Sequence, residues 1–365
     1  MRVINVNEIK PGMILAERLV SPRGQLLAEA GTSITAQQLL HATYYGIEKV
    51  AVQDEEEAID KYDDEAPDEF IGETQSWRIL NSREFKEFKQ AYNKCTDKLE
   101  AIITDFVENK VPIESEEIVE EIHRVFEKHS TGLGIMAMML NIQELDASTF
   151  QHCVNVAIIS RVCGGWIGIT DEKELDVLTM CGLYHDIGKS LVPHTILTKP
   201  DKLTKEEYAR MAEHPLLGYN LLMDAKLDRR IKLAALQHHE RNDGSGYPYG
   251  LTKDFISPFS KIIGITDVYD AMTADRVYRA GICPFEVIAQ FQREDKAKYD
   301  QHILQVFLEN IAESYIGTGV LLSDDSRGII SMINSKALSC PLVKMDDGSF
   351  IDLRERSDLF IRACI

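Results

Sequence analysis

The segments HDIGK at residues 185–189 and HHERNDGSGYPYGL at residues 238–251 decide the fold prediction. Both lie within a region, from about Ser148 to Tyr315, where apolar residues recur at helical spacing. Further histidines stand at His152 and His214, and the segment DVYDAMTADRVYR follows at residues 267–279. Because each polar group lies on a separate expected helix or at a helix end, a helical bundle can bring them to one cavity.

The residue types in these segments are typical of a metal site. Imidazole suits Zn, Fe, Cu and Ni, whereas carboxylate suits harder ions such as Mn. A mixed set of histidine and aspartate without thiolates therefore favours Fe or Mn as the bound metal. Zn is also compatible with this set. A lone histidine of this kind is more often an ordinary core or surface residue, so the prediction rests on the four segments together.

At these segments the sequence resembles the HD-GYP family of HD phosphohydrolases, from about Thr149 to Arg279. LTKPDKLTKEEY at 197–208 is similar to the connecting loop of that family, and residues 11–31 are similar to a small domain often joined to it. The resemblance implies a mostly α fold. It would be an all-helical HD-type metal phosphohydrolase bundle with a small N-terminal α/β module and a short C-terminal β extension.

The resemblance also implies a site of two transition metals. One metal would be held by His152, His185, Asp186 and Asp267. Asp186 would bridge to a second metal, which would be completed by His214, His238 and His239. Two cations about 3.5–4 Å apart that share a carboxylate can activate a bridging water for in-line attack on a phosphodiester.

Two positions depart from the family pattern. Some members use a glutamate four residues before the first histidine for a third metal, and here that position is Ser148. We therefore expect two metals, with Asp270 as an alternative ligand for an extra ion. His194 stands where the family often has aspartate, and a loop role is favoured over a role as a ligand.

The resemblance assigns substrate roles to a second set of residues. Lys189 would neutralise charge at the scissile phosphate and count with Asp186 as catalytic. Arg276 and Arg279 would grip the phosphates, a bidentate task that suits guanidinium groups. The loop after the paired histidines would border the substrate pocket through Arg241, Asp243, Gly246, Tyr247 and Pro248. Surface pairing of Arg276 and Arg279 with nearby acids remains an alternative.

The predicted function is hydrolysis of cyclic di-GMP to linear pGpG, with continuation to GMP left open. An alternative is phosphodiesterase activity on another cyclic dinucleotide such as cyclic GMP-AMP. A second alternative is a non-catalytic cyclic-dinucleotide sensor or scaffold. Metal content would distinguish the scaffold from the enzyme.

Composition and charge limit the classes of binding partner and the cellular location that we expect. The formal net charge of -19 argues against a broad surface for DNA, RNA or anionic membranes. The seven cysteines are scattered without a CxxC pair, which favours a reducing cytoplasm, and the resemblance implies a bacterial one. The first residues lack an apolar signal core, and no segment is apolar enough to span a membrane.

The pattern predicts five segments. Residues 1–52 are a small strand-rich module with a helix expected over Ile34–Tyr45, and residues 53–76 are an acidic linker. Residues 77–147 form amphipathic helices that pack or dimerise, so a second copy or a regulatory protein would bind through residues 1–147. Residues 148–316 form the catalytic domain, and residues 317–365 form a β extension.

Overall fold

The computed structural model describes residues 2–6, 9, 13–20, 26–28, 30–32, 34, 42, 47, 49–52, 74–113, 115–127, 131–142, 148–199, 201–274, 281–293 and 297–365. The chain divides into two compact units, each of which is described by itself. One comprises Met1–Trp77, Gly317–Ile330 and Val343–Ile365, and the other comprises Arg78–Ile316 and Ser331–Leu342. The domain boundaries expected from the sequence stay predictions.

Short strands make up the described part of the N-terminal segment. β1 (Arg2–Asn5) pairs antiparallel with β4 (Lys49–Val52), and β2 (Leu19–Val20) pairs antiparallel with β3 (Leu26–Ala28). The helix expected over residues 34–45 lies outside the described residues except for Ile34 and Ala42. The acidic segment over residues 54–69 also lies outside them.

The C-terminal residues form a five-stranded sheet in the order β8-β7-β6-β5-β9. The strands are β5 (Gly319–Leu322), β6 (Arg327–Asn334), β7 (Ala337–Met345), β8 (Phe350–Asp352) and β9 (Ile361–Cys364). The turn predicted at residues 346–348 is confirmed, because it joins β7 to β8 and Gly348 has a φ of +81°. A β module therefore follows the helices, as expected.

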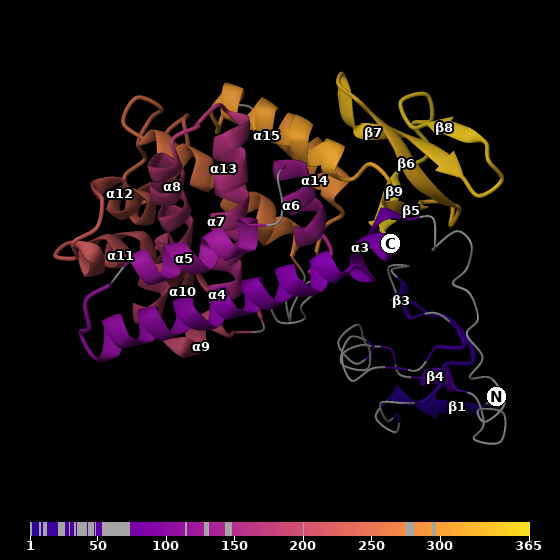
Figure 1. The fold of residues 1–365 in the computed structure, drawn as a ribbon, viewed down its shortest axis with the longest axis horizontal. Helices are drawn as coiled ribbons and strands as arrows, with labels where there is room; N and C mark the ends of the chain where they lie inside the picture. Colours follow the sequence, from indigo (N-terminus) through magenta and orange to yellow (C-terminus); the bar gives the residue numbers. More distant parts are fainter. Residues whose placement is uncertain are drawn as a thin grey trace. The chain divides into compact units, whose positions relative to one another are not determined.

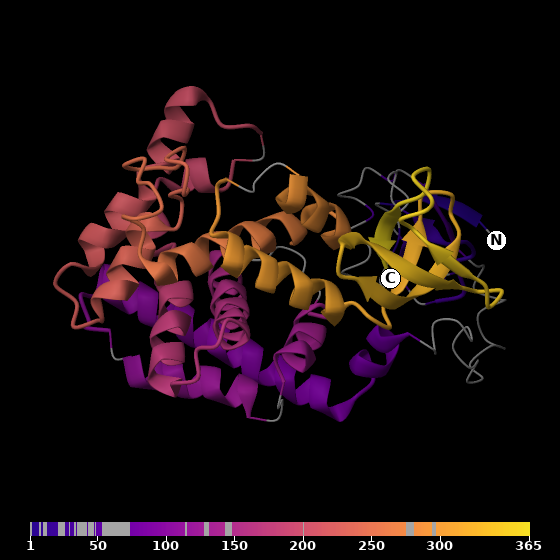
Figure 2. The same ribbon diagram turned by 90° about the horizontal axis from the view of Figure 1, so that it is seen from above.

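Helices dominate the rest, which confirms the mostly α fold class (Figures 1 and 2). They are α3 (Gln75–Leu80), α4 (Arg83–Glu108), α5 (Ser115–Phe126), α6 (Gly132–Met139), α7 (Thr149–Trp166), α8 (Glu172–Tyr184), the 3-10 helix η2 (Ile187–Leu191), α9 (His194–Leu197), α10 (Lys205–Met211), α11 (His214–Leu222), α12 (Arg229–Gln237), α13 (Pro258–Thr273), α14 (Pro284–Arg293) and α15 (Gln301–Ser314). Among the residues that the structure describes, no helix combines the length and apolar character that a membrane crossing requires.

Capping residues set where these helices begin. The capping box predicted at Thr204 and Glu207 is confirmed: Thr204 Oγ1 accepts from Glu207 N, and Glu207 Oε2 accepts from Thr204 N. Ser148 and Gln151 form the same motif at the start of α7. Both helices therefore start at residues that their local sequence specifies.

Helices α7 and α8 lie at the centre of the bundle and pack closely. A Cβ placed on Gly182 would lie 2.5 Å from Ala157 Cα, so the two backbones meet where a side chain has no room. On another side of α7, the long helix α4 buries Tyr92, whose hydroxyl lies 2.7 Å from Asn155 Oδ1 (Figure 1). This packing fixes the ends of α7 and α8, where the polar cluster begins.

Candidate metal centre

Five histidines and two aspartates gather from five regions of the bundle. His152 lies in α7, His185 and Asp186 follow α8, His214 begins α11, His238 and His239 follow α12, and Asp267 lies in α13. Six of these residues are buried, and the His239 side chain is 19% exposed. The structure thus brings together all seven residues that the sequence predicted as metal ligands.

Their donor atoms fall into two groups. Asp186, His214, His238 and His239 form one group, and His152, His185 and Asp267 form the other. Within each group, every residue offers a donor atom within 4.8 Å of the others. That spacing is what a cation needs to contact several donors at once.

Asp186 faces both groups, one oxygen to each. Its Oδ2 lies 3.3 Å from His185 Nε2 and 3.6 Å from His152 Nε2. Its Oδ1 lies 3.2 Å from His214 Nε2 and 3.6 Å from His238 Nε2. A carboxylate in this position is placed to bridge two cations.

Four of the histidines are oriented in the same way. The Nδ1 atoms of His185, His214 and His238 lie 2.7–3.1 Å from the carbonyl oxygens of Gly182, Met211, Ala234 and Ala235. His152 Nδ1 lies 2.6 Å from Asp270 Oδ2. A ligand histidine commonly donates one ring N–H to such an acceptor, which orients the other nitrogen toward the metal.

Asp270 therefore contacts His152 on the side of the ring away from the cluster. Sequence reasoning raised Asp270 as a ligand for an extra ion and missed this contact. The signal was present in the spacing, because Asp270 follows Asp267 by three residues and so lies on the same helix face.

The donor set fits metal ions. Across the described ranges, His185 Nε2 and Asp186 Oδ1 are buried side-chain atoms without a hydrogen-bond partner. Buried polar atoms are normally paired, so an unpaired nitrogen and an unpaired oxygen that face one cluster suit a bound cation. Imidazole nitrogens and carboxylate oxygens are ligands for first-row transition metals.

The pKa values of three of these buried side chains also suit metal binding. Burial lowers the pKa of His238 to about 4, and burial also holds the pKa of His239 well below its usual range. Burial works to raise the pKa of Asp186, but the Lys189 ammonium together with His185 and His214 keeps that pKa well below the ordinary value. These three groups are therefore in the deprotonated form that binds metal.

The pKa of His185 is raised rather than lowered. Burial alone would lower its pKa, but the neighbouring Asp186 and Asp267 carboxylates raise that pKa to about 10. The same balance, set by Asp267 and Asp270, raises the pKa of His152. In the protein without metal, protons on these rings supply positive charge that a cation would replace, so metal binding should release protons.

Lys189 lies at the same cluster. Its Nζ is 2.5 Å from Asp186 Oδ2, and its side chain is 21% exposed. The residue lies in η2, in which Gly188 packs closely against α11. A Cβ on Gly188 would lie 2.0 Å from His214 O. The ammonium is thus held where the buried carboxylate meets solvent.

The loop after His239 is organised by the buried Glu240, which sequence reasoning did not single out. Its two carboxylate oxygens accept hydrogen bonds from the backbone N–H groups of Tyr249 and Leu251, each at 2.8 Å. Tyr247 stacks on His239, with ring centroids 4.6 Å apart. Gly246 is required by space, because a Cβ there would lie 2.4 Å from His239 O.

The remaining predicted site residues are placed as follows. Arg241 Nη1 donates to the carbonyls of His238 and Glu240, and the exposed Asp243 accepts from Ser245. Pro248 follows a cis peptide bond. Arg276 and Arg279 lie outside the described residues. The exposed His194 begins α9, and Ser148 caps α7, so neither is among the grouped donors.

Comparisons with known proteins show which domain contains this cluster. The model of the HD domain family matches residues 136–303. Over 71% of the chain, the sequence is 30% identical to a cyclic di-GMP phosphodiesterase of Pseudomonas aeruginosa, of which it covers 63%. The chain contains an HD domain. All seven predicted ligand positions lie within the matched range.

Two further proteins are similar. A 3'3'-cGAMP-specific phosphodiesterase of Vibrio cholerae is 34% identical over 50% of the chain and 43% of its own length. A solved structure, described as an HDG"Y"P protein from Bdellovibrio bacteriovorus, matches 84% of the chain and 97% of its own length. Its TM-score is 0.52 at 18% identity, so it supports the fold of this chain alone. The chain spans 63% and 43% of the length of these two curated relatives.

Proposed function

We propose that this chain is a metal-dependent phosphodiesterase that hydrolyses cyclic di-GMP to linear pGpG. The observation that carries the proposal is Asp186, whose two oxygens face two separate groups of histidines. Hydrolysis of a phosphodiester needs charge stabilisation at both the attacking and the leaving oxygen, which a two-metal site provides. The cyclic di-GMP phosphodiesterase of Pseudomonas aeruginosa supports this choice of substrate.

In this proposal two transition metals occupy the site, with Fe or Mn favoured and Zn compatible. His152, His185, Asp186 and Asp267 hold one of them, and Asp186, His214, His238 and His239 hold the other. Bound metals supply the Lewis acid that polarises a phosphodiester and activates water for attack.

The chain's own residues supply position and charge. Lys189 keeps an ammonium beside Asp186, where it can neutralise charge on a phosphate that approaches from solvent. Tyr247 covers His239 and, with Arg241, Asp243, Gly246 and Pro248, belongs to the loop that we assign to the substrate pocket. Arg276 and Arg279 are proposed to grip the phosphates. The cytoplasmic location inferred from the cysteines, and a dimer or regulatory partner bound through residues 1–147, remain part of the proposal.

The test is to purify the full chain without oxygen, measure bound Fe, Mn and Zn, and follow conversion of cyclic di-GMP by chromatography. Close to two metals per chain and formation of pGpG are the expected results. Neither metal nor turnover, even after reconstitution, would refute the proposal and favour a non-catalytic sensor or scaffold.

A second substrate has its own support. The similarity to the 3'3'-cGAMP-specific phosphodiesterase of Vibrio cholerae favours a mixed cyclic dinucleotide as the alternative. The same metal-loaded preparation should be offered both dinucleotides in competition. A higher kcat/KM for 3'3'-cGAMP would replace cyclic di-GMP with the mixed dinucleotide while leaving the metal site unchanged.

A further inference from the structure

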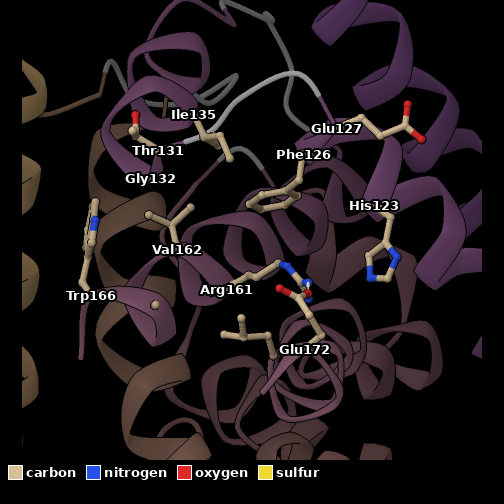
Figure 3. A pocket seen from close by; sticks show the side chains of 12 residues that line it. His123, Phe126, Glu127, Thr131, Gly132, Ile135, Arg161, Val162, Trp166 and Glu172 are labelled. Atoms are coloured by element: carbon tan, nitrogen blue, oxygen red, sulfur yellow. Dashed lines mark hydrogen bonds and ion pairs between the residues drawn. The ribbon is translucent and has the colours of Figure 1, made fainter. Parts of the chain in front are cut away.

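A cavity of about 540 Å³ lies at the end of α7 and the start of α8 (Figure 3). The metal centre lies at the opposite ends of these helices, because His152 is near the start of α7 and His185 follows α8. Arg161 is nine residues beyond His152 on α7, which places it about 14 Å farther along the helix axis. The walls come from the end of α5, the start of α6, the last turns of α7 and the first turn of α8. Phe126, Ile135, Val162, Trp166 and Leu175 make much of this wall apolar.

A buried guanidinium lies in the middle of the cavity. The Arg161 side chain is only 6% exposed, and its Cζ lies 5.3 Å from the centre of the Phe126 ring. Its Nη1 donates to Asp176 Oδ1 at 2.7 Å, an inner contact that ties α7 to α8. Its Nη2 donates to Glu172, whose side chain is 72% exposed.

The two carboxylates therefore differ in how firmly they are held. Asp176 is 22% exposed and also lies 2.7 Å from His123 Nε2. Glu172 reaches its contact from the surface, so water can compete for this ion pair on the Glu172 side, while the Arg161 guanidinium stays buried. The Nη2 edge of Arg161 is thus a binding position for a carboxylate whose present occupant reaches it from solvent.

Other features of the cavity also favour an anion with an apolar body. The indole N–H of Trp166 has no acceptor in the described parts of the chain, and α6 begins at the cavity wall with Thr131 as its cap. A helix N-terminus favours negative charge. A Cβ placed on Gly165 would meet nothing within 4 Å, so open space adjoins this wall. Glu127 also lines the cavity, and in Figure 3 it lies on the far side of Phe126 from Trp166.

We propose that this cavity binds a small organic carboxylate with an apolar body, whose carboxylate replaces Glu172 on Arg161 while its body packs against Trp166 and Val162. Guanidinium binds carboxylate in a planar, bidentate manner, so the exchange keeps the same chemistry at Nη2. The apolar body adds buried area that the Glu172 side chain does not supply. This site is independent of the phosphodiesterase proposal.

Fluorescence of Trp166 tests the proposal in the full chain. Of the two tryptophans, Trp77 would be replaced by phenylalanine so that only Trp166 reports. The probes are cyclohexylacetate, the neutral cyclohexylacetamide and the cationic 2-cyclohexylethylamine, at matched ionic strength. We expect saturable binding of the carboxylate alone, with a Kd on the order of 1 mM, as is usual for a probe of this size. Tighter binding of the amine, or saturation by none of the probes in the millimolar range, would overturn the proposal.

Four variants separate binding from structure. Glu172→Gln should tighten cyclohexylacetate binding by about two- to fivefold, because the competing carboxylate is gone. Glu174→Gln is the matched control, since Glu174 lies in the same first turn of α8, pairs with Arg230 and does not line the cavity. Gly165→Leu should fill the open space and abolish binding, whereas Gly165→Ser should retain it. If Arg161 only clamped the helices, Glu172→Gln would leave the affinity unchanged, and that result would refute the exchange.

Discussion

At the scale of single residues, Asp186 links the two groups of donors. Its oxygens face His185 and His214 at 3.3 and 3.2 Å, so in the proposed two-metal site its loss would remove a ligand from both positions at once. Asp186→Ala should therefore lose both metals and all hydrolysis, as measured by elemental analysis and product chromatography. The exposed Asp254→Ala is the control for the charge change. Full metal content in Asp186→Ala would contradict the bridging role.

Asp270 is predicted to act through His152. Asp270→Ala removes the acceptor of the His152 ring N–H, and loss of such a partner typically weakens metal binding by about 10- to 100-fold. Asp270→Asn keeps an amide oxygen in the same place and should lose much less affinity. Metal titration of the apoprotein measures both variants. Equal losses in the two variants would argue against an orienting hydrogen bond.

Lys189 is predicted to serve catalysis rather than metal binding. Its side chain reaches Asp186 from the solvent side, so Lys189→Ala should keep the fold and the bound metal. Turnover should fall by about 10²–10³-fold, the range seen when one charge-stabilising donor is removed. The measurement is kcat per bound metal. Unchanged kcat in a fully loaded variant would remove Lys189 from the mechanism.

At the scale of elements, Glu240 couples the end of α12 to the loop after it. Both of its oxygens accept backbone N–H groups in a buried site, and a glutamine offers only one acceptor. Glu240→Gln should therefore destabilise the protein by about 1–3 kcal/mol, the cost of one unsatisfied buried group. Urea unfolding measures the change, with the exposed Glu206→Gln as control. A stability equal to the control's would show that Glu240 does not hold the loop.

At the scale of the whole molecule, thiol reactivity reports on how tightly the bundle is closed. Cys95, Cys153, Cys163 and Cys181 are buried, and Cys283, Cys340 and Cys364 are partly exposed. Burial raises the pKa of Cys95 and of Cys163 to about 12, so at pH 8 these thiols stay protonated and unreactive.

Native protein at pH 8 should therefore react with iodoacetamide at the three partly exposed cysteines only, and at all seven after denaturation. Peptide mass spectrometry would identify the labelled positions. Rapid labelling of Cys163 in native protein would show that the α7–α8 core opens much more readily than its packing indicates.

The local sequence determined the helices and the identity of the donors. Helical spacing, the capping box at Thr204 and the turn at Gly348 depend on neighbours within a few residues, so they could be read directly. The histidines and aspartates of the cluster were assigned through motifs whose residue types themselves carry the metal chemistry.

Only the tertiary structure decided how those residues face one another. His152 and Asp267 are 115 positions apart, and their contact depends on how α7 and α13 pack, which no local pattern encodes. The same packing decides which oxygen of Asp186 faces which histidines, and it turns Asp270 toward a ring rather than toward the cluster. The same packing also creates the cavity at Arg161, because the walls of that cavity come from four different helices.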